Sequence, residues 1–284
     1  MFPNFAFAGQ PSIIALMHDF VSFNGRIIAA GDVQLPALAA ATLYGKGVFT
    51  TVAIYGGIAE WWFEHWRRLS RDAPKVGVDI SALDLAGTGH AIDELVRQNG
   101  VTDGRARVTF FDGSPTELWP FSLPNQTSVL ITTADFLPKP ENFKLTVSPY
   151  TLNSTSPLTG VKSCNYMEKI LAKSEARARG FHECIQLNER GEVVSASMAN
   201  VFWRKDDQLY TPSLKTGCVP GITRLQGIEG SDCMEVEAGL ADLRSADGIF
   251  LTSAGLCAVQ VVEFDGAPLP AECDEFVLGF ERFG

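Results

Sequence analysis

Three lysines lie in one short stretch of the chain, and one of them could act as an amine nucleophile. Lys162 comes just before a helical pattern, whereas Lys169 and Lys173 lie within that pattern. An uncharged lysine amine attacks carbonyl carbons to form a Schiff base, and it can then act as a base toward a neighbouring carbon. A lone loop lysine is ordinarily a solvated surface residue, so the neighbouring motifs must decide between the two interpretations.

Two further segments contain residue types that bind a phosphate group. Arg68 lies in HWRRL, residues 65–69, and its guanidinium can hold phosphate oxygens in a planar fork. Ile222 and Thr223 lie in PGITR at a predicted helix start, where free backbone N–H groups and the helix dipole favour an anion. Both segments also have plain structural interpretations, with Arg68 as a polar residue on a surface helix and Thr223 as an N-cap.

Residues 165–179 have the spacing of an amphipathic helix. The pattern predicts one buried face and places the charged residues on the others. The predicted buried residues are Met167, Ile170, Leu171, Ser174 and Ala178. Lys169 and Lys173 are thereby interpreted as ordinary solvent-facing residues, and Lys162 stays outside the helix.

The elements that must position these residues are strands and helices in mixed order. Asn24-Gly25 predicts a hairpin turn, and residues 47–55 predict a strand rich in β-branched and aromatic residues. Residues 63–78 predict a helix that carries Arg68. Hairpin-rich sheets with interspersed helices indicate an α/β protein of the α+β type, not a doubly wound parallel sheet.

The chain of 284 residues is long enough for two lobes. A proline-rich segment without periodicity, residues 113–128, is the predicted connection between them. We predict a small N-terminal α/β lobe over residues 1–122, which carries Arg68. Residues 123–284 are predicted to form a larger lobe with Lys162 and a hairpin-rich, barrel-like sheet.

Composition limits the possible partners and the location. The net charge of −10 argues against nucleic acid as a partner, and no apolar run reaches the ~18–20 residues that span a bilayer. The 6 cysteines are scattered without a C-x-x-C pair, which predicts reduced thiols and a cytoplasmic location. The 4 histidines are scattered too, so no metal site is predicted.

Five blocks of the sequence, taken in order, resemble the class IV aminotransferases, the fold-type IV enzymes that use pyridoxal 5'-phosphate (PLP). The blocks are YGKGVFTT at 44–51, HWRRL at 65–69, VKSCNY at 161–166, NVF at 200–202 and PGITR at 220–224. The resemblance covers roughly residues 18–265. Each block alone is weak, but five in the right order are specific. The resemblance implies PLP as cofactor, a small-molecule amino substrate and a homodimer.

The resemblance also implies roles for individual residues. Lys162 matches the lysine that forms the Schiff base with PLP and then acts as the base beside the substrate Cα. The residues that match the phosphate site are Arg68, Ile222, Thr223 and, in FLTSAG, Ser253. Tyr166 matches a tyrosine that bonds the phenolic oxygen of the cofactor, although it could equally be a core aromatic residue of the helix.

One cofactor position departs from the family pattern. Five residues before Asn200 the family usually has a glutamate that holds the pyridine nitrogen protonated, and this chain has Ser195. A hydroxyl can hydrogen-bond the nitrogen but lacks the negative charge, a loss of roughly 1–2 kcal/mol. The ring could work unprotonated, or another carboxylate could substitute, namely Glu183 or Glu192, which should point to the opposite face of its strand. The third alternative is that PLP chemistry has been lost.

Two short sequence segments favour one branch of the family. Phe49-Thr50-Thr51 and the ANVFWRK segment are similar to aminodeoxychorismate lyases, whereas branched-chain transaminases usually have FEG at the first position. The leading hypothesis is therefore an elimination from 4-amino-4-deoxychorismate that gives 4-aminobenzoate and pyruvate. An amino-acid transaminase of the branched-chain or D-amino acid type is the alternative. A degenerate, non-catalytic PLP-binding protein is the third possibility.

Overall fold

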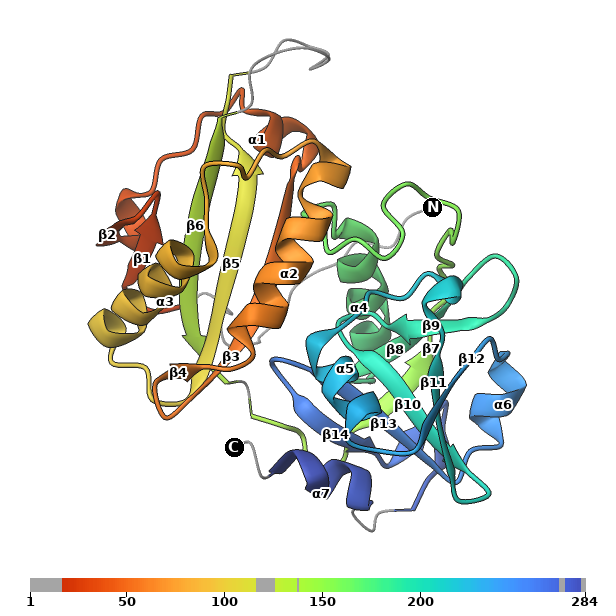
Figure 1. Cartoon of the computed structure of the whole chain (residues 1–284). Coiled ribbons are helices and arrows are strands. Elements are labelled where there is room, and N and C mark those ends of the chain that lie inside the picture. The colour runs from red at the N-terminus through yellow and green to blue at the C-terminus, as the bar shows by residue number, and fades with distance from the viewer. Residues whose placement is uncertain (1–16, 116–125, 137, 271–273, 282–284) are drawn as a thin grey trace.

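A computed structural model of the chain describes residues 17–115, 126–136, 138–270 and 274–281. The described residues form two parts that lie side by side in Figure 1. The first part, coloured from red to yellow-green, contains one sheet, and the second, coloured from green to blue, contains two. The predicted mixture of helices with hairpin-rich sheets is confirmed.

The first part is built on a six-stranded antiparallel sheet with the order β2-β1-β6-β5-β3-β4. Its strands are β1 Phe20–Phe23, β2 Arg26–Ala29, β3 Gly47–Tyr55, β4 Ile58–Ala59, β5 Gly104–Asp112 and β6 Thr127–Asp135. Asn24 and Gly25 join β1 to β2 with φ angles of 50° and 76°. Both angles are positive, as the tightest hairpin turn requires, so the predicted hairpin is confirmed.

Two long helices cover one face of this sheet (Figure 1). They are α2, Trp62–Asp72, and α3, Leu85–Asn99, and the short α1, Ala40–Tyr44, precedes β3. Their apolar sides enclose a core with the sheet that includes Val48, Ile54, Leu69, Ile92, Leu95, Val108 and Phe110. The helix predicted over residues 63–78 ends at Asp72 because Pro74 lacks a backbone donor, and a 3₁₀ turn follows at Pro74–Val76.

The second part contains two five-stranded sheets, ordered β12-β11-β10-β13-β14 and β16-β15-β7-β8-β9. The strands are β7 Lys144–Val147, β8 Glu183–Leu187, β9 Val193–Ala196, β10 Asn200–Lys205, β11 Gln208–Pro212, β12 Cys233–Val236, β13 Gly248–Ser253, β14 Cys257–Val261, β15 Glu263–Phe264 and β16 Ala267–Pro268. The helices are α4 Met167–Ala178, α5 Ile222–Glu229, α6 Leu240–Arg244 and α7 Glu275–Glu281.

The sheets of the second part do not close into the predicted barrel-like form. Among the described residues neither sheet closes on itself, and each ends in two edge strands. The two sheets instead enclose a shared apolar core, to which Leu145 and Ile185 of one sheet and Trp203 and Leu251 of the other contribute. Packing two open sheets on each other buries the same apolar faces that closure would have buried.

The predicted boundary between residues 122 and 123 lies outside the described residues, as does the N-terminal segment before Met17. β6 follows that boundary and still belongs to the first sheet, between β1 and β5. The chain enters the second part at β7. The division into lobes of residues 1–122 and 123–284 stays a prediction.

The helix predicted around residue 170 is present as α4, but its predicted buried face is wrong. Ala172 and Ala176 are the buried residues, and they pack against Cys184 of β8. The residues predicted to be buried, Met167, Ile170, Leu171, Ser174 and Ala178, are all exposed. Lys169 and Lys173, which were predicted to face solvent, instead turn toward β8, because Gln186 and Glu183 offer them polar partners. The small alanines let the helix approach the strand closely.

This orientation predicts opposite effects of two similar substitutions in α4. Ala172→Leu adds volume to a closed contact and should lower the free energy of unfolding by about 1–3 kcal/mol. Ser174→Leu adds similar bulk on the exposed face and should change it by less than about 0.5 kcal/mol. Urea denaturation of both variants measures the difference, and a larger loss for Ser174→Leu would contradict the orientation of α4.

Candidate active site

Lys162 lies in an extended segment that pairs with the start of β3. The N–H of Phe49 donates to the carbonyl of Lys162 at 2.9 Å, and the N–H of Cys164 donates to the carbonyl of Gly47 at 2.8 Å. A Cβ at Gly47 would meet the carbonyl oxygen of Phe110 at 2.9 Å. The close crossing of β3, β5 and this segment therefore requires glycine at position 47.

The amine of Lys162 is held among aromatic rings. Its Nζ lies 3.3 Å from the hydroxyl of Tyr166 and 4.5 Å from the centroid of the Phe49 ring. Burial, and next the positive charge of Arg68, hold the pKa of this amine far below its ordinary value. Folding therefore shifts the amine toward its uncharged form, which is the nucleophilic one.

Helix α2 positions both Lys162 and Arg68. The carboxylate of Asp72 accepts a hydrogen bond from the backbone N–H of Lys162 at 3.1 Å. One turn earlier, the guanidinium of Arg68 is only 7% exposed and donates to the hydroxyl of Thr50 at 2.6 Å and to the carbonyl of Pro220 at 3.2 Å. Arg68 thus connects α2 and β3 to the segment that begins α5.

The proton arrangement beside Arg68 follows from its contacts. The hydroxyl of Thr50 accepts from Arg68, so it donates its own hydrogen to Nδ1 of His65 at 2.5 Å. This bond assigns the hydrogen of the imidazole to Nε2. Burial, and then the charges of Arg68 and Lys162, hold the pKa of His65 well below its ordinary value. Burial lowers the pKa of Arg68 to about 10, so Arg68 stays cationic at neutral pH while His65 is neutral.

The structure brings the predicted helix start to Arg68. Ile222 and Thr223 are the first residues of α5, and both are buried. Gly221 precedes them as the N-cap and supplies no capping side chain, so the first N–H groups of α5 lack a side-chain acceptor there. A Cβ at Gly221 would meet Oδ1 of Asn200 at 2.1 Å, so this turn also requires glycine.

Buried donors without partners lie in the same region. Nε of Arg68 and the hydroxyl of Thr252 are buried and have no hydrogen-bond partner among the described residues. Thr252 pairs with Asn200 across β13 and β10, and Ser253 follows it. The hydroxyl of Ser253 accepts from the N–H of Leu256 at 3.2 Å. A guanidinium, helix-start N–H groups and a free hydroxyl form a donor set that fits a phosphate group.

Tyr166 contacts both Lys162 and Phe49. It precedes α4 as the N-cap residue, and its ring meets Phe49 edge to face at 5.1 Å. Burial raises the pKa of Tyr166 to about 12, so its hydroxyl keeps its hydrogen at neutral pH. A protonated phenol next to Lys162 can donate a hydrogen bond to an anionic oxygen.

The contacts near Ser195 bear on one of the three alternatives for this position, the substitution by another carboxylate. Ser195 lies buried on β9. The carboxylate of Glu183 is 3.2 Å from Nζ of Lys173, and the carboxylate of Glu192 is 2.6 Å from Arg190 in the turn between β8 and β9. Both candidate carboxylates are therefore engaged in ion pairs of their own.

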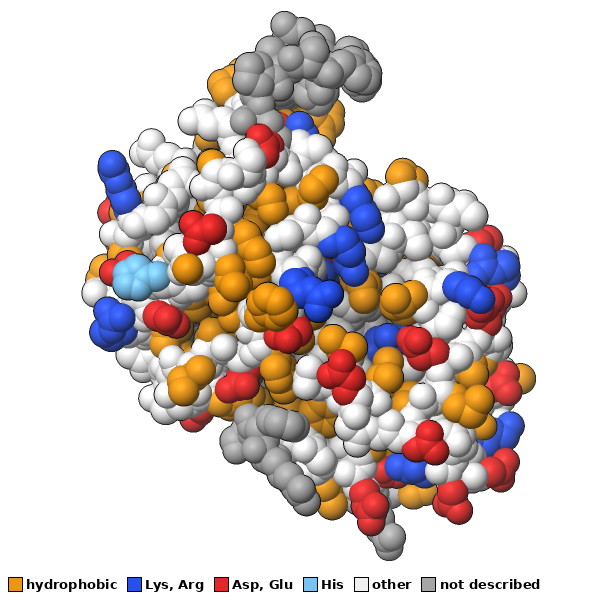
Figure 2. Space-filling view, viewed as in Figure 1, with side chains coloured by type: hydrophobic (Ala, Val, Ile, Leu, Met, Phe, Trp, Pro, Cys, Tyr) orange, Lys and Arg blue, Asp and Glu red, His pale blue; other side chains and the backbone are white. Residues whose placement is uncertain are grey.

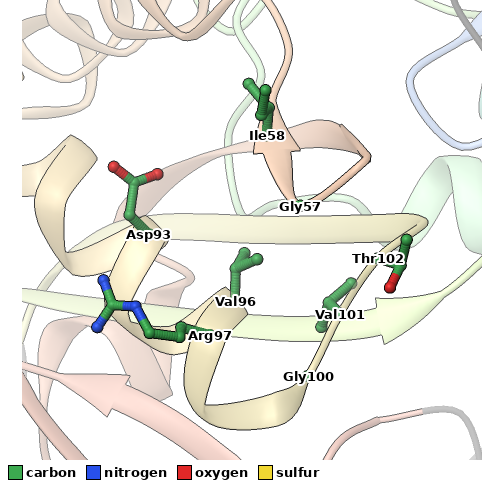
Figure 3. Close-up of a pocket in the computed structure, with 8 residues that line it drawn as sticks. All are labelled: Gly57, Ile58, Asp93, Val96, Arg97, Gly100, Val101 and Thr102. Atoms are coloured by element: carbon green, nitrogen blue, oxygen red, sulfur yellow. The ribbon is translucent and has the colours of Figure 1, made fainter.

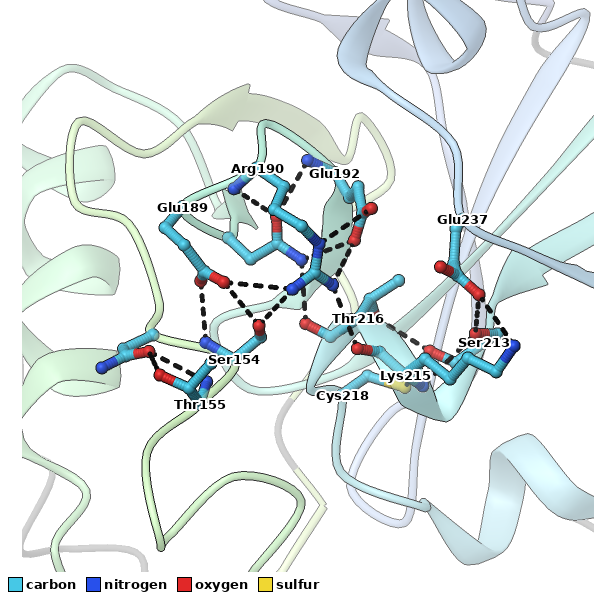
Figure 4. A network of polar contacts seen from close by, with 12 residues as sticks. Ser154, Thr155, Glu189, Arg190, Glu192, Ser213, Lys215, Thr216, Cys218 and Glu237 are labelled. Carbon is cyan, nitrogen blue, oxygen red and sulfur yellow. Dashed lines mark hydrogen bonds and ion pairs between the residues drawn. The ribbon is translucent and has the colours of Figure 1, made fainter.

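A polar network joins that turn to the two loops that lead to the site (Figure 4). Arg190 donates to the hydroxyl of Ser154 at 2.5 Å and to the carbonyl of Lys215 at 3.2 Å. The carboxylate of Glu189 accepts from the N–H of Ser154 at 2.8 Å. Ser154 lies in the segment before Lys162, and Lys215 lies in the segment before α5. The turn that contains Glu189 and Arg190 therefore holds both segments in place.

Arg107 is a further candidate that the sequence motifs did not indicate. It lies on β5, and its guanidinium carbon is 3.6 Å from the centroid of the Phe49 ring. Its charge contributes to the lowered pKa of Lys162. The sequence did contain a signal for Arg107. In RARVTFF this arginine alternates with apolar residues, and such spacing places it on one face of a strand.

A shallow depression near the end of α3 lies apart from these residues (Figure 3). It is lined by Gly57, Ile58, Asp93, Val96, Arg97, Gly100, Val101 and Thr102. None of the candidate-site residues described in this section lines it, so it is not part of the candidate site.

Comparison with known families agrees with this geometry. The family model described as amino-transferase class IV matches residues 47–264, which include Arg68, Lys162 and the start of α5. The chain belongs to the class IV aminotransferases. Enzymes of this family use PLP, so this member is a PLP-dependent enzyme.

Individual relatives of this class IV aminotransferase have different activities. It is 30% identical over 254 residues to a putative branched-chain-amino-acid aminotransferase of Methanocaldococcus jannaschii, covering 87% of this chain and 88% of the relative. It is also 30% identical over 247 residues to the aminodeoxychorismate lyase of Bacillus subtilis, covering 82% of each chain. The branched-chain aminotransferase of Thermoproteus uzoniensis, solved with norvaline, superposes with a TM-score of 0.87 at 27% identity over 93% of this chain and 94% of its own.

The lowered pKa of Lys162 predicts a pH-dependent stability effect. The folded protein binds a proton at this amine less tightly than the unfolded chain does, so at a pH below 10.5 the lowered pKa opposes folding. Cofactor-free Lys162→Met should therefore melt at a higher temperature than the cofactor-free wild type, by about 2–4 °C for each kcal/mol relieved. The gap should shrink as pH rises toward 10.5, the ordinary pKa of lysine. Calorimetry across this pH range measures it, and a gap that does not vary with pH would contradict the shift.

Proposed function

We propose that this protein is a PLP-dependent lyase that releases 4-aminobenzoate and pyruvate from 4-amino-4-deoxychorismate. The observation that carries the proposal is Ser195, buried on β9 at the position where the family usually has a glutamate, while Glu183 and Glu192 are engaged elsewhere. Without a carboxylate at the pyridine nitrogen, the ring withdraws electrons less strongly. An elimination driven by aromatisation tolerates a weaker electron sink better than a transamination does.

Residues of both parts of the chain would hold the cofactor. The phosphate would lie against Arg68, the first N–H groups of α5 and the hydroxyl of Thr252 or Ser253, and Tyr166 would face the phenolic oxygen. Lys162 would bond the aldehyde. Bound PLP would supply an electrophilic carbon and a ring that withdraws electrons from the substrate Cα.

The chain itself would bind the substrate and move its proton. The uncharged amine of Lys162 can accept the proton from the substrate Cα, because burial disfavours the charged form. Arg107 would bind a substrate carboxylate, since its cation lies beside the Phe49 ring that also contacts Lys162. The two products together contain all atoms of the substrate, so no second substrate is required.

An amino-acid transaminase of the branched-chain or D-amino acid type is the second candidate. Its support comes from the Methanocaldococcus relative and the Thermoproteus structure, whose names describe branched-chain aminotransferases. Lys162, Arg68 and Arg107 could serve this reaction as well. A transaminase requires a keto acid to accept the amino group, whereas the lyase does not, and this requirement separates the two.

Assembly and location are further parts of the proposal. Met167, Ile170 and Leu171 form an exposed apolar stripe on α4, which supports a homodimer that sedimentation velocity can test. The 5 described cysteines are free thiols, which suits a cytoplasmic location. Within the described ranges no helix is long and apolar enough to cross a membrane. Acidic and basic side chains are interspersed on the face seen in Figure 2, which supports a small-molecule substrate over nucleic acid.

The first test of function combines labelling with product analysis. Borohydride reduction of the PLP-loaded protein should attach a pyridoxyl group to Lys162, as peptide mass spectrometry can show. The Lys162→Met variant should lack the label, and Lys173→Met, a matched change in α4, should keep it. The wild type should then release pyruvate from 4-amino-4-deoxychorismate without a keto acid. Release that depends on a keto acid would favour the transaminase, and no label at all would favour a non-catalytic protein.

The second test concerns Arg107. Arg107→Met should raise KM for the substrate about 10–100-fold, because a hydrogen bond to a charged group contributes about 1.5–3 kcal/mol. Labelling of Lys162 and kcat should change much less. Arg105→Met, two residues away on the same strand, is the control and should leave KM within about twofold. Equal effects of the two substitutions would argue against a substrate contact by Arg107.

A further inference from the structure

The face of β8 and β9 that α4 covers contains a donor without an acceptor. Gln186 is 0% exposed, and its Nε2 has no hydrogen-bond partner among the described residues. A buried donor without a partner costs about 1–3 kcal/mol. Such a group in a native protein calls for an explanation, and a bound ligand is one.

Lys169 and Ser195 lie next to this amide. Nζ of Lys169 donates to Oε1 of Gln186 at 3.4 Å, which engages the carbonyl and leaves the NH₂ group free. Ser195 is the direct partner of Gln186 across β8 and β9, so both side chains point to the same face. Lys169 also approaches the ring of Tyr166 to 5.8 Å, and the hydroxyl of Tyr166 contacts Lys162. The group is therefore continuous with the candidate active site.

Two carboxylates act on the charge of Lys169, and neither is free within this group: Glu168 lies exposed in the first turn of α4, and Glu183 is paired elsewhere. Burial lowers the pKa of Lys169, and the charge of Glu183 opposes this shift. Its carboxylate already pairs with Lys173 and accepts from the hydroxyl of Ser197. An anionic acceptor stabilises a protonated pyridine nitrogen, whereas a hydrogen-bond donor stabilises the unprotonated one. The available groups are an amide NH₂, a hydroxyl and an amine, and all three can donate.

We propose that Gln186, Ser195 and Lys169 receive the ring nitrogen of PLP and keep it unprotonated. The inference rests on the proposed PLP site. Gln186 or Ser195 donates a hydrogen bond to the nitrogen, and the positive charge of Lys169 opposes protonation of the nitrogen itself. The consequence is a weak electron sink, which restricts the enzyme to reactions with a readily departing group at the next carbon. This specifies the substrate class more narrowly than the family does.

The test reads the protonation of the cofactor directly. The enzyme is loaded with PLP labelled with ¹⁵N in the ring, and free labelled PLP titrated through its own ring pKa gives the chemical shifts of the two forms. The wild-type enzyme should show the unprotonated shift at neutral pH. The Ser195→Glu, Lys169→Met double variant supplies a carboxylate and removes the cation, so its shift should move toward the protonated form. Ser174→Glu adds a carboxylate on the exposed face of α4 and should leave the shift unchanged.

The outcomes distinguish this inference from the proposed function. A protonated shift in the wild type, with Lys162 still labelled by borohydride, would overturn the inference and leave the PLP site intact. A wild type that binds no PLP would overturn both. If the double variant does not fold, Gln186→Leu replaces it and should lower the affinity for PLP about 5–30-fold, and unchanged affinity with an unchanged shift would remove Gln186 from the site.

Discussion

The burial of one guanidinium constrains the whole site. Arg68 is 7% exposed and remains a cation, and a buried charge without partners costs several kcal/mol. Its partners come from separate segments: Thr50 from β3 and the carbonyl of Pro220 from the turn before α5. Neither segment can move away without leaving the charge unpaired. The one nitrogen that these partners do not satisfy, Nε, is the one that remains for an anion.

The same helix sets the place of the nucleophile. Asp72 follows Arg68 by one turn of α2 and accepts a hydrogen bond from the backbone of Lys162. The same rigid helix therefore positions both the proposed phosphate site and the amine. The turn around Arg190 then holds the loops before Lys162 and before α5. A site assembled from loops is thus fixed by a helix on one side and a polar clamp on the other, which provides the preorganisation that catalysis requires.

Sequence reasoning reached the fold class, the first hairpin, β3 and the two residue groups that meet at Arg68, because each has a local signature. It misjudged α4, since helical spacing shows that two faces differ but not which one is buried. That choice depends on Gln186 and Glu183 of β8, which come after the helix in the chain. Arg107 was missed for a related reason: its neighbours Phe49 and Lys162 are distant in sequence, and only the pairing of β3 and β5 brings them together.

The pairing of the Lys162 segment with the start of β3 has a consequence for how the cofactor is acquired. These two segments lie more than a hundred positions apart along the polypeptide, so the amine is desolvated only after both parts have docked. Before that, the side chain is an ordinary ammonium ion and reacts poorly with aldehydes. High reactivity toward an aldehyde is thereby a property of the folded protein and not of the unfolded chain.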